Sequence, residues 1–291
     1  MRKSWGLSLI AWGMAILTFA FIWFLWAGKD LIDYDNELPV QSLSFTQNFS
    51  EVNNITIHGG LADTIVITLD SSTQISANIT GHLDAIRATR ESRDFVIGSP
   101  STGINIRQCS WFKECPSISR LVSIEVIIPF DFTGNIFIYG VAPTITVNSP
   151  RLTNNFKYLA INTAESKINL TNISSDIFIN TAKLDLTLLS IANSLSVNST
   201  SAYISYTPAV NESANLNISA GFVDMSVFQM PTKGVLIEST GINTTITEDQ
   251  VERRYFASQS FDFDYDGSDQ KIEVSVNALY AIINIEKKIT P

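Results

Sequence analysis

The sequence reads AINTA at residues 160–164, FINTA at 178–182 and SVNST at 196–200, so one short pattern returns every 18 residues. Each copy alternates apolar with polar side chains, which is typical of a β-strand with one buried face. A second spacing, of nine residues, links the central apolar residues of successive alternating runs. The pairs with this spacing are Ile138/Val147, Ile161/Leu170, Ile179/Leu188, Val197/Tyr206, Ile218/Val227 and Ile237/Ile246. The body of the chain is therefore a repeat, and each unit has two strands and two turns.

A single unit of this kind cannot bury its inward Ile, Val and Leu side chains, whereas stacked units can, with each strand ~4.8 Å from its predecessor. We therefore expect an all-β fold, a β-solenoid (β-helix) of about 18–20-residue coils, over residues 45–288. Asn, Ser and Thr at matching positions would form ladders of hydrogen bonds along the turns. The alternative is an antiparallel sandwich or barrel, which also has many short strands.

Both ends of such a stack need caps, because open strand edges recruit other chains. The charged stretch at residues 87–94 is expected to cap the first end, and residues 271–288 are expected to cap the other. Between the caps, each unit is expected to stack on the unit that precedes it in the chain.

The first 44 residues predict a membrane anchor followed by a linker. Residues 5–28 carry no charge, and ~20 apolar residues in a helix are enough to cross a bilayer. Arg2 and Lys3 precede this run, so residues 1–4 are expected to be a cytoplasmic head and everything after the anchor to be extracytoplasmic. Residues 29–44 are the expected linker. A cleaved signal peptide is the alternative, although its apolar region is normally shorter.

The composition narrows the classes of function. The formal net charge is -9, with 19 basic and 28 acidic residues, so the chain has no electrostatic footprint for nucleic acid. His58 and His82 are the only histidines, and neither lies in a motif that resembles a nucleophile elbow. We expect no catalytic residues and no cofactor, with calcium as the one candidate discussed below.

Two stretches resemble a known family. Residues 54–67 read NITIHGGLADTIVI, and residues 122–129 read VSIEVIIP. They resemble the opening coil, and the strand that ends in Ile-Pro before the regular ladder, of the "putative adhesin" β-solenoid domains of microbial envelope proteins. The resemblance covers about residues 45–285 and implies a β-solenoid in the cell envelope. The family's molecular function is largely unassigned, so the resemblance implies a fold and a location more than an activity.

The two cysteines predict a structural disulfide. Cys109 and Cys115 are six residues apart and do not form a C-x-x-C motif, so an outward location favours a closed loop over a redox-active pair. Trp111 and Phe112 lie inside that loop and are candidate partner contacts, because Trp is enriched at interface hot spots. In the alternative interpretation, Trp111 folds back over the solenoid as a lid.

The sharpest motif near the end of the chain is a candidate calcium loop. Asp262, Asp264, Asp266 and Glu273 match the D-x-[DN]-x-[DN]-G-x5-E pattern, in which alternate carboxylates converge on one cation. No amphipathic helix flanks the motif, so an EF-hand is not expected. The alternative is a β-hairpin with solvated acidic positions.

Together these features predict a single-pass envelope protein with its N-terminus in the cytoplasm. Its expected role is binding or scaffolding, as an adhesin-like module or an accessory subunit of a membrane assembly. The expected partner is another envelope or membrane protein or a surface glycan. An enzyme acting on envelope polysaccharide and a calcium-dependent binding module are the alternatives.

Overall fold

The computed structural model describes residues 39–83, 85–98, 121–152, 154–209, 213–229, 233–248, 251–256, 258–263, 268 and 270–287. Nearly all of them belong to one compact unit, Gln41–Gly103 and Ser119–Pro291. They form one short 3-10 helix, Phe49–Glu51, and a 17-stranded sheet. The strands are β1 (Val40–Asn48), β2 (Asn54–Gly60), β3 (Thr64–Asp70), β4 (Gln74–His82), β5 (Ala88–Glu91), β6 (Asp94–Gly98), β7 (Leu121–Pro129), β8 (Asn135–Gly140), β9 (Thr144–Asn148), β10 (Tyr158–Ile173), β11 (Asp176–Ile191), β12 (Asn193–Pro208), β13 (Ala214–Gln229), β14 (Lys233–Glu248), β15 (Val251–Tyr255), β16 (Gln259–Phe263) and β17 (Gln270–Lys287).

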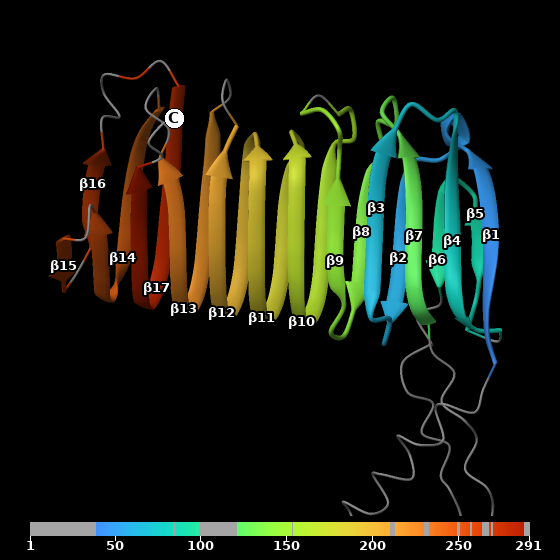
Figure 1. Ribbon diagram of the computed structural model, residues 1–291, viewed down its shortest axis with the longest axis horizontal. Helices are drawn as coiled ribbons and strands as arrows, with labels where there is room; N and C mark the ends of the chain where they lie inside the picture. The colour runs from blue at the N-terminus through green and yellow to red at the C-terminus, as the bar shows by residue number, and fades with distance from the viewer. Residues whose placement is uncertain are drawn as a thin grey trace, which may run out of the picture. The chain divides into compact units, whose positions relative to one another are not determined.

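The regular middle of the unit is β10 to β13, four strands of 16 residues that pair in parallel and in chain order (Figure 1). Their register follows the nine-residue pairs of the sequence. Ile161 pairs with Ile179, Ile179 with Val197, and Val197 with Ile218. The second members of these pairs align in the same way, from Leu170 through Leu188 and Tyr206 to Val227. The all-β class is confirmed, and these four strands form no antiparallel sandwich.

Each long strand turns a corner at its middle. In β11, Ile177 and Ile179 are buried in the first half, and Leu184 and Leu186 in the second, so the buried positions change from odd to even numbers. Neighbouring side chains of a strand point to opposite faces. A change from odd to even buried positions therefore means that the two halves of the strand bury opposite faces. The corner between the halves lets both halves face one hydrophobic core.

We call the two surfaces that result the N-half ladder and the C-half ladder. The N-half ladder contains the strand halves before each corner, such as residues 176–181 of β11, and it continues onto β8. The C-half ladder contains the halves after each corner, such as residues 183–189 of β11, and it continues onto β9.

Hydroxyl groups secure the corners from inside, as the sequence predicted for Ser and Thr at matching positions. The Thr181 hydroxyl lies 3.1 Å from the carbonyl oxygens of both Ala164, on the preceding strand, and Lys183. Ser199 repeats this arrangement one strand later, 3.2 Å from the carbonyl oxygen of Ala182 and 2.8 Å from that of Ser201. Each hydroxyl therefore joins its own corner to the corner before it.

The N-terminal end departs from chain order. β2 lies between β6 and β8, and β3 lies between β7 and β9, so later strands flank both of these strands on both sides. Beyond them, β5 pairs antiparallel with β6, and β4 pairs antiparallel with β7. The charged stretch at 87–94 thus contributes an outer strand, β5, as expected. The first strand begins at Val40, inside the expected linker.

The C-terminal end corrects two predictions. β14 does not stack on β13, because β17 pairs in parallel with both and lies between them (Figure 1). Residues 271–288 were expected to cap this end, yet β15 and β16 do so by pairing antiparallel with the two halves of β14. The physical reason is that β15 follows β14 directly and folds back on it as a hairpin. Together β15 and β16 occupy the outer edge of β14. The inner edge is then where β17 pairs.

Candidate binding face

The outward side of the C-half ladder carries exposed large side chains on three adjacent strands. Phe222 on β13 pairs with Tyr280 on β17, and Tyr203 on β12 lies diagonally beside Phe222 with 5.7 Å between the ring centroids. Tyr203 is 46% exposed, Tyr280 56% and Ile282 37%. We call Tyr203, Phe222, Tyr280 and Ile282 the aromatic strip. Phe222, between Tyr203 and Tyr280, is half-buried. Exposed large side chains that adjoin one another on a surface mark a candidate contact site.

A shallow groove of about 570 Å³ begins at Tyr203 and extends toward β9 and β10. Four charged side chains line it. Lys183 donates to Glu165 over 2.5 Å, and Lys167 lies 3.8 Å from Asp185. The hydrogen bond to Glu165 and its negative charge raise the pKa of Lys183. Such exposed pairs contribute little to stability, but they balance the charge of the groove.

A row of small polar residues lies beside the aromatic strip on the same ladder. The register places one member on each of six successive strands. The members are Thr146, Asn169, Thr187, Ser205, Ser226 and Asn284. We call this set the polar row. Each strand therefore presents a hydroxyl or an amide at the same height, next to the larger side chains of the strip.

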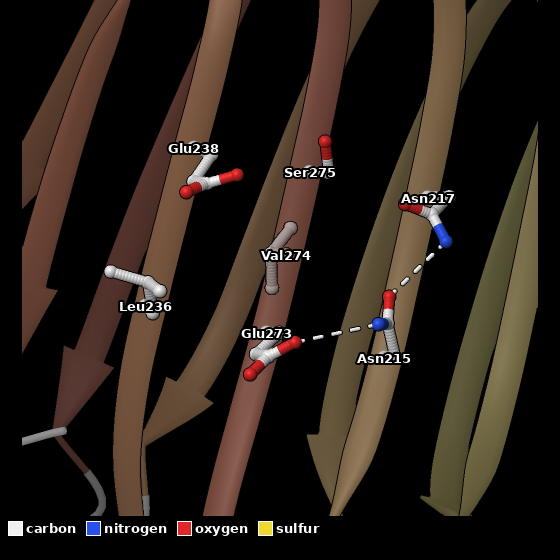
Figure 2. Close-up of a pocket in the computed structure, with 7 residues that line it drawn as sticks. All are labelled: Asn215, Asn217, Leu236, Glu238, Glu273, Val274 and Ser275. Atoms are coloured by element: carbon white, nitrogen blue, oxygen red, sulfur yellow. Dashed lines mark hydrogen bonds between the residues drawn. The ribbon is translucent and has the colours of Figure 1, made fainter.

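The N-half ladder carries a smaller polar pocket of about 260 Å³ near the C-terminal end (Figure 2). Glu273 on β17 accepts a hydrogen bond from the Asn215 amide over 3.4 Å, and Asn217 donates to Asn215 over 3.1 Å. Glu238 on β14 and Ser275 on β17 lie at the other side of the pocket (Figure 2). The pocket is thus rich in oxygen ligands from two carboxylates, two amides and a hydroxyl.

The candidate calcium loop is only partly described. Asp262 on β16 and Glu273 on β17 both pair with Leu236 of β14, from opposite sides. They are therefore two strand spacings apart, or ~10 Å between backbones. Asp264 and Asp266 lie outside the described residues, and among those described no three His, Cys, Asp or Glu side chains gather at metal-binding distance. The calcium site stays a prediction.

Three further predictions fall outside the described residues. They are the anchor at 5–28, the disulfide between Cys109 and Cys115, and the contacts of Trp111 and Phe112. In the part of the chain that the structure describes, no helix combines the length and the apolar character needed to span a bilayer.

The aromatic strip was not found in the sequence. Tyr203, Phe222 and Tyr280 occupy outward positions, where the repeat has no fixed residue type. Tyr203 and Phe222 could have been brought together by the repeat offset of β12 and β13. Tyr280 could not, because the sequence did not indicate that β17 lies beside β13.

Comparison with known proteins gives structural matches only: no family model and no curated protein matches the chain. One matching structure is a "putative cell adhesion protein" from Clostridium sporogenes, with 12% identity, a TM-score of 0.38, and coverage of 86% of this chain and 100% of that chain. Another is a "putative adhesin" from Bacteroides fragilis, with 9% identity, a TM-score of 0.38, and coverage of 84% and 97%. A third is a "putative lipid binding protein" from Parabacteroides distasonis, with 12% identity, a TM-score of 0.30, and coverage of 84% and 96%.

Proposed function

We propose that this chain is an adhesin-like binding module that an N-terminal anchor at residues 5–28 displays outside the cell membrane. The observation that carries the proposal is the aromatic strip. Tyr203 and Tyr280 keep about half of their surface exposed on adjacent parts of one ladder. Exposing such side chains is unfavourable in the free protein, and aromatic side chains are the typical anchors of binding interfaces.

The proposed architecture for this role is a two-sided β-solenoid. Its support is the parallel register of β10 to β13 and the corner that turns both strand halves onto one core. Stacked coils present long surfaces with little variation in height, and such surfaces suit extended ligands. Membrane topology, scaffolding of a membrane assembly and the absence of catalysis remain parts of the proposal that rest on the sequence.

The test is co-purification from the native membrane. Tagged full-length chain, solubilised gently, should retain a partner that is lost when Tyr203 and Tyr280 are both changed to Ser. The matched control is Tyr139→Ser, which alters an exposed aromatic residue on the N-half ladder, away from the strip. Equal retention by all three forms, or no bound material with any of them, would overturn the proposal.

Calcium-dependent binding is the second candidate, and it rests on the motif Asp262, Asp264, Asp266 and Glu273. Glu273 also lines the oxygen-rich pocket of Figure 2, opposite Glu238. A ligand that binds only the folded state raises the melting temperature. Millimolar calcium should therefore raise the Tm of the full-length chain, and Glu238→Gln should reduce the rise. If calcium leaves the Tm of the wild-type chain unchanged, this candidate is wrong.

A further inference from the structure

We infer that the polar row and the aromatic strip together bind a linear, uncharged glycan that lies across the strands. The inference rests on the proposed binding function and specifies its ligand. It depends on three properties of the C-half ladder: the spacing of its contacts, their chemistry and their charge balance.

The spacing favours an extended polymer of regular repeat. In-register strands are ~4.8 Å apart, and each contributes one residue to the polar row. The length of one pyranose unit in an extended glycan is close to that spacing. A chain running from Asn169 to Asn284 would therefore meet a hydrogen-bonding group on each of five strands.

The chemistry of the two rows matches the two kinds of surface on a sugar. Hydroxyl and amide groups, such as those of Thr187 and Asn284, both donate and accept hydrogen bonds, as sugar hydroxyls do. The rings of Tyr203 and Tyr280 offer apolar area against which the C–H face of a pyranose packs. Farther along β11 and β13, Leu189 and Phe228 lie on the other side of the polar row, which is thus bordered by larger side chains.

The charge balance of the C-half ladder argues against a polyanion as its ligand, and the residue composition of the ladder argues against a protein. Both lysines of the groove are already paired with a carboxylate, Lys183 with Glu165 and Lys167 with Asp185. Asp224 lies beside Tyr203 in the register and adds a negative charge. An anionic polymer would therefore be repelled. Protein interfaces are depleted in charged residues at their centres. The groove beside the strip is instead lined by four of them, Glu165, Lys167, Lys183 and Asp185.

The direct test is binding of neutral oligosaccharides to full-length chain in nanodiscs. The immobilised probes are β-1,4- and β-1,3-glucan, mannan and chitin fragments of two to eight units, with hyaluronan and polygalacturonate as anionic probes. At least one neutral series should bind, with affinity that rises with length, and the anionic probes should not bind. Tyr203→Ala and Tyr280→Ala should each weaken binding roughly tenfold, the loss of one aromatic contact.

Ser205→Leu is a second variant, because it places a large side chain in the polar row without removing an aromatic ring. It should remove the gain in affinity with length, so that the longer fragments bind about as weakly as the shortest. Tyr139→Ser is again the control, with wild-type affinity expected. Binding of no neutral series, or equal binding of neutral and anionic probes, would overturn the inference.

The same co-purification separates this inference from the proposed function. Material bound through the strip should yield neutral monosaccharides on acid hydrolysis and should resist protease. If the strip variants lose their partner but the partner proves to be a protease-sensitive protein that yields no neutral sugar, the glycan inference fails and the binding function stands. If the strip variants keep their partner, both fail.

Discussion

The regular middle and the two ends of the sheet follow different rules. From β10 to β13, strands stack in the order in which the chain makes them. At the N-terminal end β2 lies between two later strands, and at the C-terminal end β17 lies between two earlier ones. At both ends, antiparallel strands then pair with the outermost parallel strands: β4 and β5 with β7 and β6, and β15 and β16 with β14. The repeat therefore determines which strands pair only in the regular middle. At both ends, strands that are out of chain order or antiparallel end the parallel stacking.

The largest expected effect comes from two deletions of equal size. The first deletion removes residues 176–193, which is 18 residues, the offset at which β10 pairs with β11 and β11 with β12. β10 can then pair directly with β12, with apolar residues still facing apolar residues. Removing β17, Gln270–Lys287 and also 18 residues long, leaves β13 and β14 as two unpaired edges. Stability of a stacked fold is approximately a sum over neighbouring units.

The first deletion should therefore lower stability and keep a monodisperse β protein, whereas the second should aggregate or unfold. Far-UV circular dichroism, size-exclusion chromatography and urea unfolding distinguish these results. Equal behaviour of the two deletions would show that the ends and the middle are equivalent, against the comparison.

The corner hydroxyls of β11 and β14 should differ in what they connect. Thr181→Val leaves the corner carbonyls of two strands without a buried donor and should cost about 1–3 kcal/mol. At the corner of β14, Ser239 instead bonds Thr244 of its own strand over 2.7 Å, so Ser239→Ala should not loosen one strand from another. Thr187→Val, the same change at an exposed site, is the control for urea unfolding. A change as small for Thr181→Val as for Thr187→Val would contradict the linking role.

One buried side chain of the regular middle carries a polar group without a hydrogen-bond partner. Tyr206 is buried where the strands on either side place Leu188 and Val227, and its hydroxyl has no hydrogen-bond partner. Burial also raises the pKa of Tyr206, which keeps the hydroxyl protonated. Tyr206→Phe should stabilise the chain by about 1 kcal/mol, because it removes an unpaired buried group. Thermal unfolding measures the gain; the exposed Tyr203→Phe should leave the Tm unchanged, and a lower Tm for Tyr206→Phe would mean that the hydroxyl has a partner.

The smallest expected effect concerns pH at the N-terminal end. His58 on β2 stacks on Tyr139 with 5.2 Å between centroids, and burial lowers the pKa of His58 below its ordinary 6.5. The unfolded chain then binds the proton more readily than the folded chain, so stability falls as the pH drops below 6.5 toward the lowered folded pKa. The Tm should decrease modestly on acidification, and His58→Phe should reduce that decrease. An unchanged slope in the variant would assign the pH dependence to other groups.

The sequence predicted the middle better than the ends for a physical reason. Apolar residues recur at the positions of Ile179 and Leu188 because each strand of the middle packs on a strand with the same buried pattern, so the periodicity indicates the register. Val276 and Ile285 have the same nine-residue spacing as Ile237 and Ile246, so periodicity cannot indicate which pair adjoins Ile218 and Val227. β15 and β16 occupy the outer edge of β14, so β17 pairs at its inner edge and lies next to β13. The aromatic strip was out of reach for the same reason, because Tyr280 reaches it only through β17.

The position of β17 between β13 and β14 also determines when the sheet can be completed during folding. Its 18 residues end at Lys287, and their partners on β13 lie 58 residues earlier in the chain. Until they arrive, β13 and β14 each expose an edge and an apolar row that only this strand satisfies. A chain that leaves the ribosome or a translocation channel N-terminus first can build its middle progressively. Closure of the C-terminal end waits for β17, which is made after both of its neighbours, so a chain without β17 is marked by those two open edges.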